Sequence, residues 1–108
     1  MIIQNVHILG VDYVLTEIHQ ECNDRNMPTI NDVESCRESL GTIMSQIQNA
    51  SFFGVTRDKF MPKGCYLIPL SGKVYFNTYP KSYSHAVRHE TRAICVGSRG
   101  NLRINYFG

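Results

Sequence analysis

Four cysteines and a pair of histidines are the residues of this sequence whose types and spacing could do chemistry. The cysteines are even in number, lie far apart and form no C-x-x-C pair. Structural zinc ligands usually come in pairs a few residues apart, so the spacing predicts disulfide bonds rather than a zinc site. The four positions are Cys22, Cys36, Cys65 and Cys95.

His85 and His89 are four residues apart, a spacing that would place both imidazoles on one face of a helix. The segment lacks helical periodicity and offers no third ligand, so we predict a solvated loop and no bound metal or cofactor. Cys65 or Cys95 with one of these histidines could instead form the thiolate–imidazolium nucleophile of a small hydrolase. That alternative requires a free thiol and disappears if all four cysteines are bridged.

Carboxylates and glycines offer no competing chemistry. Nothing in the sequence places two of Asp12, Glu17, Asp58 and Glu90 together as a catalytic pair. The run 97–100 holds two glycines but is better explained as a turn than as a phosphate-binding loop. We therefore predict that the protein is not an enzyme.

Length and composition indicate one globular domain covering residues 1–108. Of the 108 residues, 43% are hydrophobic and 19% are charged, a balance typical of a folded rather than a disordered protein. The net charge of +2 is small, and Lys and Arg are scattered along the chain, which argues against a nucleic-acid partner. No apolar run approaches the roughly 20 residues that span a bilayer, so we predict no membrane span.

The cysteines and the start of the chain point to different compartments. Disulfides form in oxidising environments, which indicates an extracellular or cell-surface location. The segment from Met1 to His7 nevertheless lacks the basic region and apolar core of a signal peptide. We expect that a signal was removed and Met1 is not native, or that the chain is the mature part of a longer protein. A cytosolic protein with four free thiols is the third alternative.

An amphipathic helix is expected from about Asn31 to Gln48. Asn31 can cap it by accepting a hydrogen bond from the backbone N–H of Glu34, whose side chain can reach back as in a capping box. Gly41 inside this helix is expected to let another element approach closely. Six apolar side chains share one stripe: Val33, Cys36, Leu40, Ile43, Met44 and Ile47.

The β-prone segments around this helix predict an α+β fold, with one amphipathic helix packed on a small antiparallel sheet and stabilised by disulfides. Residues 65–70 and 74–79 flank a short turn and are typical of an antiparallel hairpin. Pro69 cannot donate to a sheet ladder, so we expect its strand at an edge. Further strands are expected over 2–9, 12–18, 92–96 and 102–107, which gives a core module of about 13–96 with flanking strands.

Four cysteines allow three connectivities, and the sequence alone does not select one. Cys36 lies on the buried stripe of the helix, which should face the central hairpin that begins at Cys65. The polar loop that carries Cys22 is then left to meet the last strand, which carries Cys95. We therefore expect the pairs Cys36–Cys65 and Cys22–Cys95.

Two surface features could serve recognition. Asn49-Ala50-Ser51 is an N-glycosylation sequon just beyond the helix, which makes Asn49 a candidate glycan acceptor; an unmodified helix end is the alternative. Tyr66, Tyr75 and Tyr79 gather on the hairpin, and Tyr offers a flat apolar face with a polar tip that suits sugars and proteins. Most such residues simply cover a small sheet.

Two runs of sequence are the most specific part of a wider pattern: Pro62-Lys63-Gly64-Cys65-Tyr66 and Val74-Tyr75-Phe76-Asn77, followed by Ala93-Ile94-Cys95. Over residues 13–96 the chain resembles a small four-cysteine module of predicted extracellular proteins from algae and other protists. An Ala pair often follows the helix cysteine in that module, whereas Arg37 and Glu38 stand here. The module has no established activity, so the resemblance implies an extracellular, often multi-copy or chain-building context.

These observations predict a non-enzymatic extracellular structural or assembly module whose partners are further copies or other extracellular proteins. The segments 2–9 and 102–107 can pair with each other, or one can add to the sheet of a neighbouring subunit. Repeated addition would build a filament or surface layer. The first alternative is a carbohydrate- or protein-binding module that uses Tyr66, Tyr75 and Tyr79. The second is the small Cys/His hydrolase.

Overall fold

The computed structural model describes residues 12–81 and 90–97. The strands expected over 2–9 and 102–107 lie outside the described residues, and so do His85 and His89.

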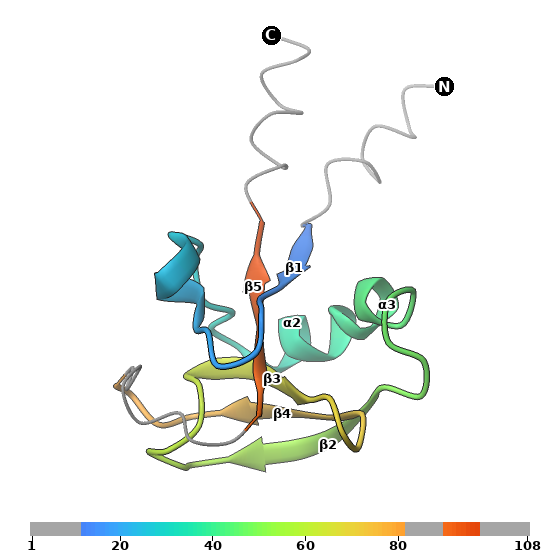
Figure 1. Ribbon diagram of the computed structural model, residues 1–108. Helices are drawn as coiled ribbons and strands as arrows, with labels where there is room; N and C mark the ends of the chain where they lie inside the picture. Colours follow the sequence, from blue (N-terminus) through green and yellow to red (C-terminus); the bar gives the residue numbers. More distant parts are fainter. Residues whose placement is uncertain (1–11, 82–89, 98–108) are drawn as a thin grey trace, which may run out of the picture.

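A five-stranded mixed sheet forms the centre of the molecule (Figure 1). Its strands lie in the order β1-β5-β3-β4-β2. With the helices described below, this sheet confirms the α+β class. The strand bounds are Tyr13–Leu15 for β1, Ser51–Thr56 for β2, Gly64–Ile68 for β3, Lys73–Asn77 for β4 and Arg92–Val96 for β5.

One strand pair departs from the antiparallel sheet that the sequence predicted, because β2 runs parallel to β4. The other pairs, β1–β5, β3–β4 and β3–β5, are antiparallel. After β2 the chain passes over the position next to it and forms β3, and the tight hairpin then returns β4 into the gap between β3 and β2. Because β4 is inserted between β3 and β2, it runs parallel to β2. The sequence pattern of a hairpin indicates only that β3 and β4 pair with each other, not which strand lies on the other side of β4.

The central position of β3 contradicts the edge position expected from Pro69, since β3 pairs with both β4 and β5. The proline follows Ile68, the last residue of the strand. Turn hydrogen bonds close beside it, from Gly72 N to Ile68 O at 2.8 Å and from Ser71 N to Ile68 O at 3.2 Å. The missing N–H of Pro69 therefore falls outside the ladder, where it costs no sheet hydrogen bond.

The helical segment begins one residue later than expected and is divided in two: α2 covers Val33–Glu38 and α3 covers Leu40–Ile43. Asp32, not Asn31, is the N-cap, and its Oδ2 accepts a hydrogen bond from the backbone N–H of Ser35 at 2.9 Å. Its Oδ1 accepts from the Ser35 hydroxyl at 2.9 Å, and these bonds lower the pKa of Asp32. Asp32 has the extended backbone that a cap requires.

Ser39 separates the two helices. Its hydroxyl donates to Cys36 O at 2.6 Å, and a serine bonded back to its own helix competes with regular helical hydrogen bonding. Beyond Ile43 the chain continues as turns as far as Asn49, whose φ is +68°. The single helix expected to reach Gln48 is therefore too long.

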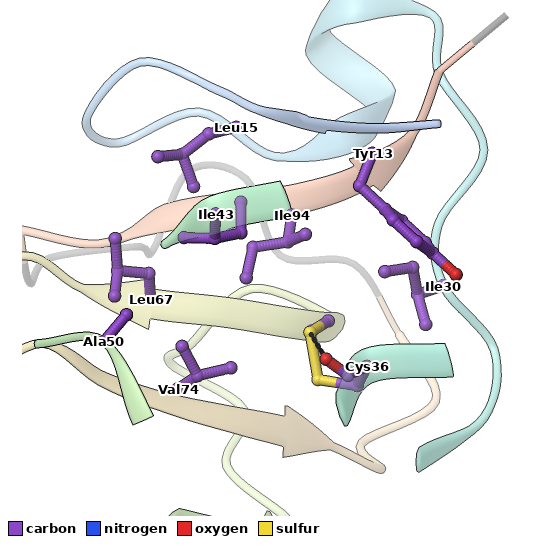
Figure 2. Packing of buried hydrophobic residues seen from close by; sticks show 10 residues of the cluster. Tyr13, Leu15, Ile30, Cys36, Ile43, Ala50, Leu67, Val74 and Ile94 are labelled. Atoms are coloured by element: carbon purple, nitrogen blue, oxygen red, sulfur yellow. Dashed lines mark hydrogen bonds between the residues drawn. A yellow bond between two sulfur atoms is a disulfide. The ribbon is translucent and has the colours of Figure 1, made fainter. Parts of the chain in front are cut away.

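The helices cover one face of the sheet, and the main core lies between the helices and the sheet (Figure 2). Of the expected stripe, Cys36 and Ile43 are fully buried, and Leu40 and Ile47 pack against the core. Met44 is 52% exposed, because a neighbouring helical position points about 100° away from Ile43. The fully formed core contains Tyr13, Leu15, Ile30, Cys36, Ile43, Ala50, Cys65, Leu67, Val74 and Ile94.

Gly41 has no packing role in the structure. It is exposed, and a Cβ built on it would meet no atom within 4 Å, so the expected close approach of another element does not occur. We predict that Gly41→Ala raises the free energy of unfolding by up to about 1 kcal/mol, through lost backbone entropy of the unfolded chain. Urea unfolding followed by circular dichroism measures this change.

Gly54 is the matched contrast for that variant. A Cβ there would also meet nothing within 4 Å, but its φ is +151°, a conformation that side chains disfavour. Gly54→Ala should therefore lower the free energy of unfolding. Equal effects of the two substitutions would contradict the argument.

Candidate functional site

Both disulfides join the cysteines that the sequence analysis paired, Cys22 with Cys95 and Cys36 with Cys65. The Cys36–Cys65 bridge ties α2 to β3 inside the main core, and both residues are fully buried. Every cysteine of the chain is therefore oxidised. The Cys/His hydrolase hypothesis loses its nucleophile, since only a thiolate attacks.

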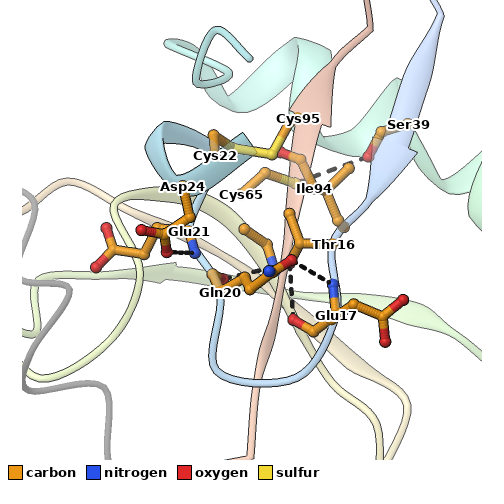
Figure 3. The surroundings of a disulfide bond; sticks show 11 residues. Thr16, Glu17, Gln20, Glu21, Cys22, Asp24, Ser39, Cys65, Ile94 and Cys95 are labelled. Carbon is orange, nitrogen blue, oxygen red and sulfur yellow. Dashed lines mark hydrogen bonds between the residues drawn. A yellow bond between two sulfur atoms is a disulfide. The ribbon is translucent and has the colours of Figure 1, made fainter. Parts of the chain in front are cut away.

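The second bridge lies on the opposite face of the sheet, where the 3-10 helix η1, Cys22–Arg25, packs on β5 (Figure 3). Cys22, Ala93 and Cys95 form a small second core there, with Met27 packed against it. Successive strand residues point to opposite faces, so β5 contributes Ile94 to one core and its two neighbours to the other.

Thr16 holds the turn that leads into η1, a role that the sequence analysis missed. It is fully buried. Its Oγ1 accepts from Ala93 N at 2.8 Å and lies 3.0 Å from Glu17 O and 3.2 Å from Gln20 O, to which it can donate (Figure 3). The turn and β5 are thereby fixed against each other, which places Cys22 beside Cys95. A lone Thr after a strand gave no sequence signal for this.

Asn77 organises the connection between β2 and β3. Only 2% of it is exposed, and its Oδ1 accepts from Asp58 N at 2.9 Å and from Tyr79 N at 3.2 Å. Its Nδ2 donates to the carbonyls of Asp58, Met61 and Pro62 at 2.8, 3.3 and 2.9 Å. One buried amide thus holds the whole loop, so Asn77 of the Val-Tyr-Phe-Asn run has a structural role.

Gly64 of the Pro-Lys-Gly-Cys-Tyr run also has a structural role. Its φ is +83°, and a Cβ there would lie 2.8 Å from Ile30 O. Only glycine fits this close approach. The two specific runs of the sequence therefore meet at one end of the β3–β4 hairpin.

The three tyrosines do not form one exposed face. Tyr66 is only 2% exposed, and burial raises its pKa. It stacks on the cross-strand Tyr75 with ring centroids 5.6 Å apart. Tyr79 lies beyond the end of β4, with the Arg57 guanidinium 5.6 Å from its ring centroid. The expectation that Tyr66 lies at the surface was wrong. The strand β5 pairs with β3 at this point, and the cross-strand partner of Tyr66 is Ala93 of the second core.

The outer strand β2 carries two exposed apolar side chains. Phe53 and Val55 are each 56% exposed. The Phe53 ring lies 6.1 Å from that of Tyr75, and Lys73 Nζ lies 4.4 Å from the Phe53 centroid. Within residues 12–81 and 90–97, β2 pairs with β4 alone, so its other edge presents unpaired backbone groups.

Charge is divided between the two halves of the described chain. Residues 12–50 hold seven carboxylates and two arginines, whereas residues 51–81 hold five cations and a single carboxylate, Asp58. The cations include Arg57 directly after β2 and Lys73 at the start of β4. The small net charge of the chain therefore conceals an acidic helical part and a basic sheet edge.

A surface pocket of about 250 Å³ lies at the end of β4. Its lining includes the apolar residues Ile30, Phe76 and Pro80 and the polar residues Lys63 and Tyr79. A second pocket of about 240 Å³ adjoins it, because both are lined by Ile30 and Asn31. Tyr13 and Ser35 line this second pocket.

The remaining predictions concern absent features and modification. Among the described residues, no three His, Cys, Asp or Glu side chains are grouped as a metal site requires. None of the helices in that part of the chain is long and apolar enough to cross a membrane. The Asn49 side chain is exposed at the turn before β2, and so is Ser51 of the same sequon.

Comparison with known proteins gives no assignment. No family model, curated protein or solved structure matches the chain.

Proposed function

We propose that the protein is a non-enzymatic extracellular structural module that self-associates through the open edge of β2. The observation that carries this proposal is an outer strand of six residues with Phe53 and Val55 exposed. Natural sheet proteins usually protect such an edge, because it is a template for pairing with another chain. In the part of the chain that the structure describes, no strand covers this edge, and the exposed apolar side chains on it favour a binding surface.

Charge complementarity favours a second copy as the occupant. The basic residues Arg57 and Lys73 flank the β2 edge, and the acidic residues Glu34 and Glu38 are exposed on α2. The acidic part of one copy therefore attracts the basic edge of the next. Contact between two different surfaces is a head-to-tail arrangement, which builds filaments or layers unless it closes into a ring.

The two disulfides support the extracellular part of the proposal, since such bridges persist in oxidising compartments. We propose that the protein lies outside the cell or at the cell surface, with further copies or other extracellular proteins as its partners. The exposed Asn49 would carry a glycan. The segments 2–9 and 102–107 remain the candidate donors of an added strand, as the sequence analysis expected.

We predict that Val55→Lys weakens self-association at least tenfold, because a charged side chain in an edge strand opposes strand addition. Sedimentation velocity over a concentration series measures the association, and negative-stain images show the polymers. Raising the salt concentration should also weaken association, since surface attraction is screened.

Leu70→Lys is the matched control, because Leu70 is also exposed but lies in the turn between β3 and β4, outside both the β2 edge and the acidic helical part. It should leave the association constant within about twofold. A native protein that stays monomeric at high concentration, or equal effects of the two variants, would contradict the proposal.

A second candidate function is carbohydrate binding, which the pockets at the end of β4 favour. Tyr79 lines the larger pocket, whereas Tyr66 is buried and Tyr75 is half-buried against it. Of the three tyrosines expected to form a binding face, only Tyr79 therefore remains a candidate sugar-binding residue. A glycan array tests it.

A further inference from the structure

We infer that the pocket at the end of β4 binds an acidic sugar unit of an oligosaccharide. This inference rests on the second function proposed above and is independent of self-association. It assigns the site and the chemical class of the ligand.

The polar groups of the pocket are available to a ligand. Among the described residues, the side chains of Asn31, Lys63 and Tyr79 make no hydrogen bond. All three residues line the same hollow, so it combines an amide, an ammonium and a phenol. Convergent polar groups around an apolar floor are the usual composition of a small-molecule site.

The charge of the pocket selects an anion. Lys63 is among the lining residues, and no carboxylate is. Arg57, whose guanidinium lies 5.6 Å from the Tyr79 ring centroid, adds a second cation beside the hollow. A carboxylate or sulfate on the ligand would meet charge-assisted hydrogen-bond donors there.

The size and shape of the site favour a sugar chain. The volume of about 250 Å³ is below the roughly 300–1,000 Å³ of pockets for drug-sized ligands and suits a single ring. The adjoining pocket of about 240 Å³ is lined by Tyr13 and also by the carboxylate Asp32, so it offers a place for a neutral next ring. Aromatic faces and scattered hydroxyl and amide groups in successive hollows suit linked sugar rings.

A peptide fits this site less well. Peptides are commonly bound by strand addition at a sheet edge or as a helix in a groove. The pocket lies at the ends of β3 and β4, which are interior strands of the sheet. It therefore offers neither mode.

The test is calorimetric titration of the intact, oxidised protein with an alternating tetramer of glucuronic acid and N-acetylglucosamine and, for comparison, a neutral N-acetylglucosamine tetramer. We expect the acidic tetramer to bind at least about tenfold more tightly, a preference that one charge-assisted contact can supply. Lys63→Gln should reduce the affinity for the acidic tetramer about tenfold, and Tyr79→Ala should reduce the affinity for both sugars. Thermal unfolding of each variant checks that it is folded.

Lys59→Gln is the matched control, since it removes the same charge from an exposed residue whose ammonium lies over the Phe60 ring. It should leave the affinity within about twofold. An equal loss with this control would show an effect of overall charge and overturn the site, as would an acidic tetramer whose binding ignores Lys63→Gln and Tyr79→Ala.

The remaining outcomes separate this inference from the function on which it rests. Equal binding of the two tetramers would overturn the acidic specificity and leave carbohydrate binding in place. Equal binding of a glutamate tetrapeptide would overturn the sugar class. A glycan array on which no sugar is bound would overturn both the inference and the second function.

Discussion

Replacing both members of either disulfide by alanine is expected to lower the free energy of unfolding by about 4 kcal/mol. The bridges close loops with sequence separations of 73 residues for Cys22–Cys95 and 29 residues for Cys36–Cys65. Chain-entropy estimates for loops of these lengths are about 4.4 and 3.6 kcal/mol respectively. Cys36 and Cys65 are also fully buried, so their removal costs packing in addition.

A domain of this size has a total stability of roughly 5–15 kcal/mol, so the loss of one bridge uses a large part of it and the loss of both should unfold the chain. Urea unfolding of the paired variants measures the first effect, and circular dichroism under reductant measures the second. Intact mass before and after reduction reports both bridges, because each adds two hydrogens when it opens. A paired variant within about 1 kcal/mol of the native protein would contradict the expectation.

Asn77→Ala is expected to lower the free energy of unfolding by about 3 kcal/mol, because buried groups that lose their hydrogen-bond partners cost about 1–3 kcal/mol each. The variant removes five hydrogen bonds, two to backbone N–H groups and three to carbonyls. Asn23 supplies the control, since it is exposed on η1. Asn23→Ala should change the stability by less than about 0.5 kcal/mol.

Asn77→Asp separates the hydrogen bonds from side-chain volume. Its second carboxylate oxygen would face the three carbonyls that now accept from Nδ2, so folding should raise the pKa of the new Asp. A raised pKa in the folded state means that stability is gained as the pH falls and lost as the pH rises through that pKa. The free energy of unfolding of the Asn77→Asp variant should therefore rise relative to that of the Asn77→Ala variant as the pH falls. A difference that does not depend on pH would contradict this account of the loop.

Local patterns predicted the parts of the fold that depend on neighbouring residues. The β3–β4 hairpin and β5 were predicted because their apolar runs and turn residues are contiguous in sequence. The disulfide pairs followed once Cys36 was placed on the buried side of its helix. The same local reasoning chose Asn31 as the cap, one residue before Asp32, since both residue types can accept the capping bond.

The features that sequence could not supply depend on distant contacts. No strand was predicted where β2 lies, because the parallel partner of this strand, β4, lies beyond β3 in the chain. The burial of Tyr66 and the five bonds of Asn77 likewise depend on which strands and loops lie beside them. The candidate pocket unites residues from three separated segments, and no spacing in the sequence indicates that they meet.

The place of β5 in the sheet has a consequence for biosynthesis. In the described part of the chain β1 pairs with β5 alone, and β5 is the last strand to be made. A nascent chain can form the Cys36–Cys65 bridge and the hairpin while β1 still has no partner strand. Cys22 also cannot form its disulfide until β5 is synthesised, because its partner Cys95 lies in β5. Among the described strands, β1 is thus the first to be synthesised and the last to gain a partner. Until β5 is available, only other molecules around the nascent chain can protect β1 from aggregation.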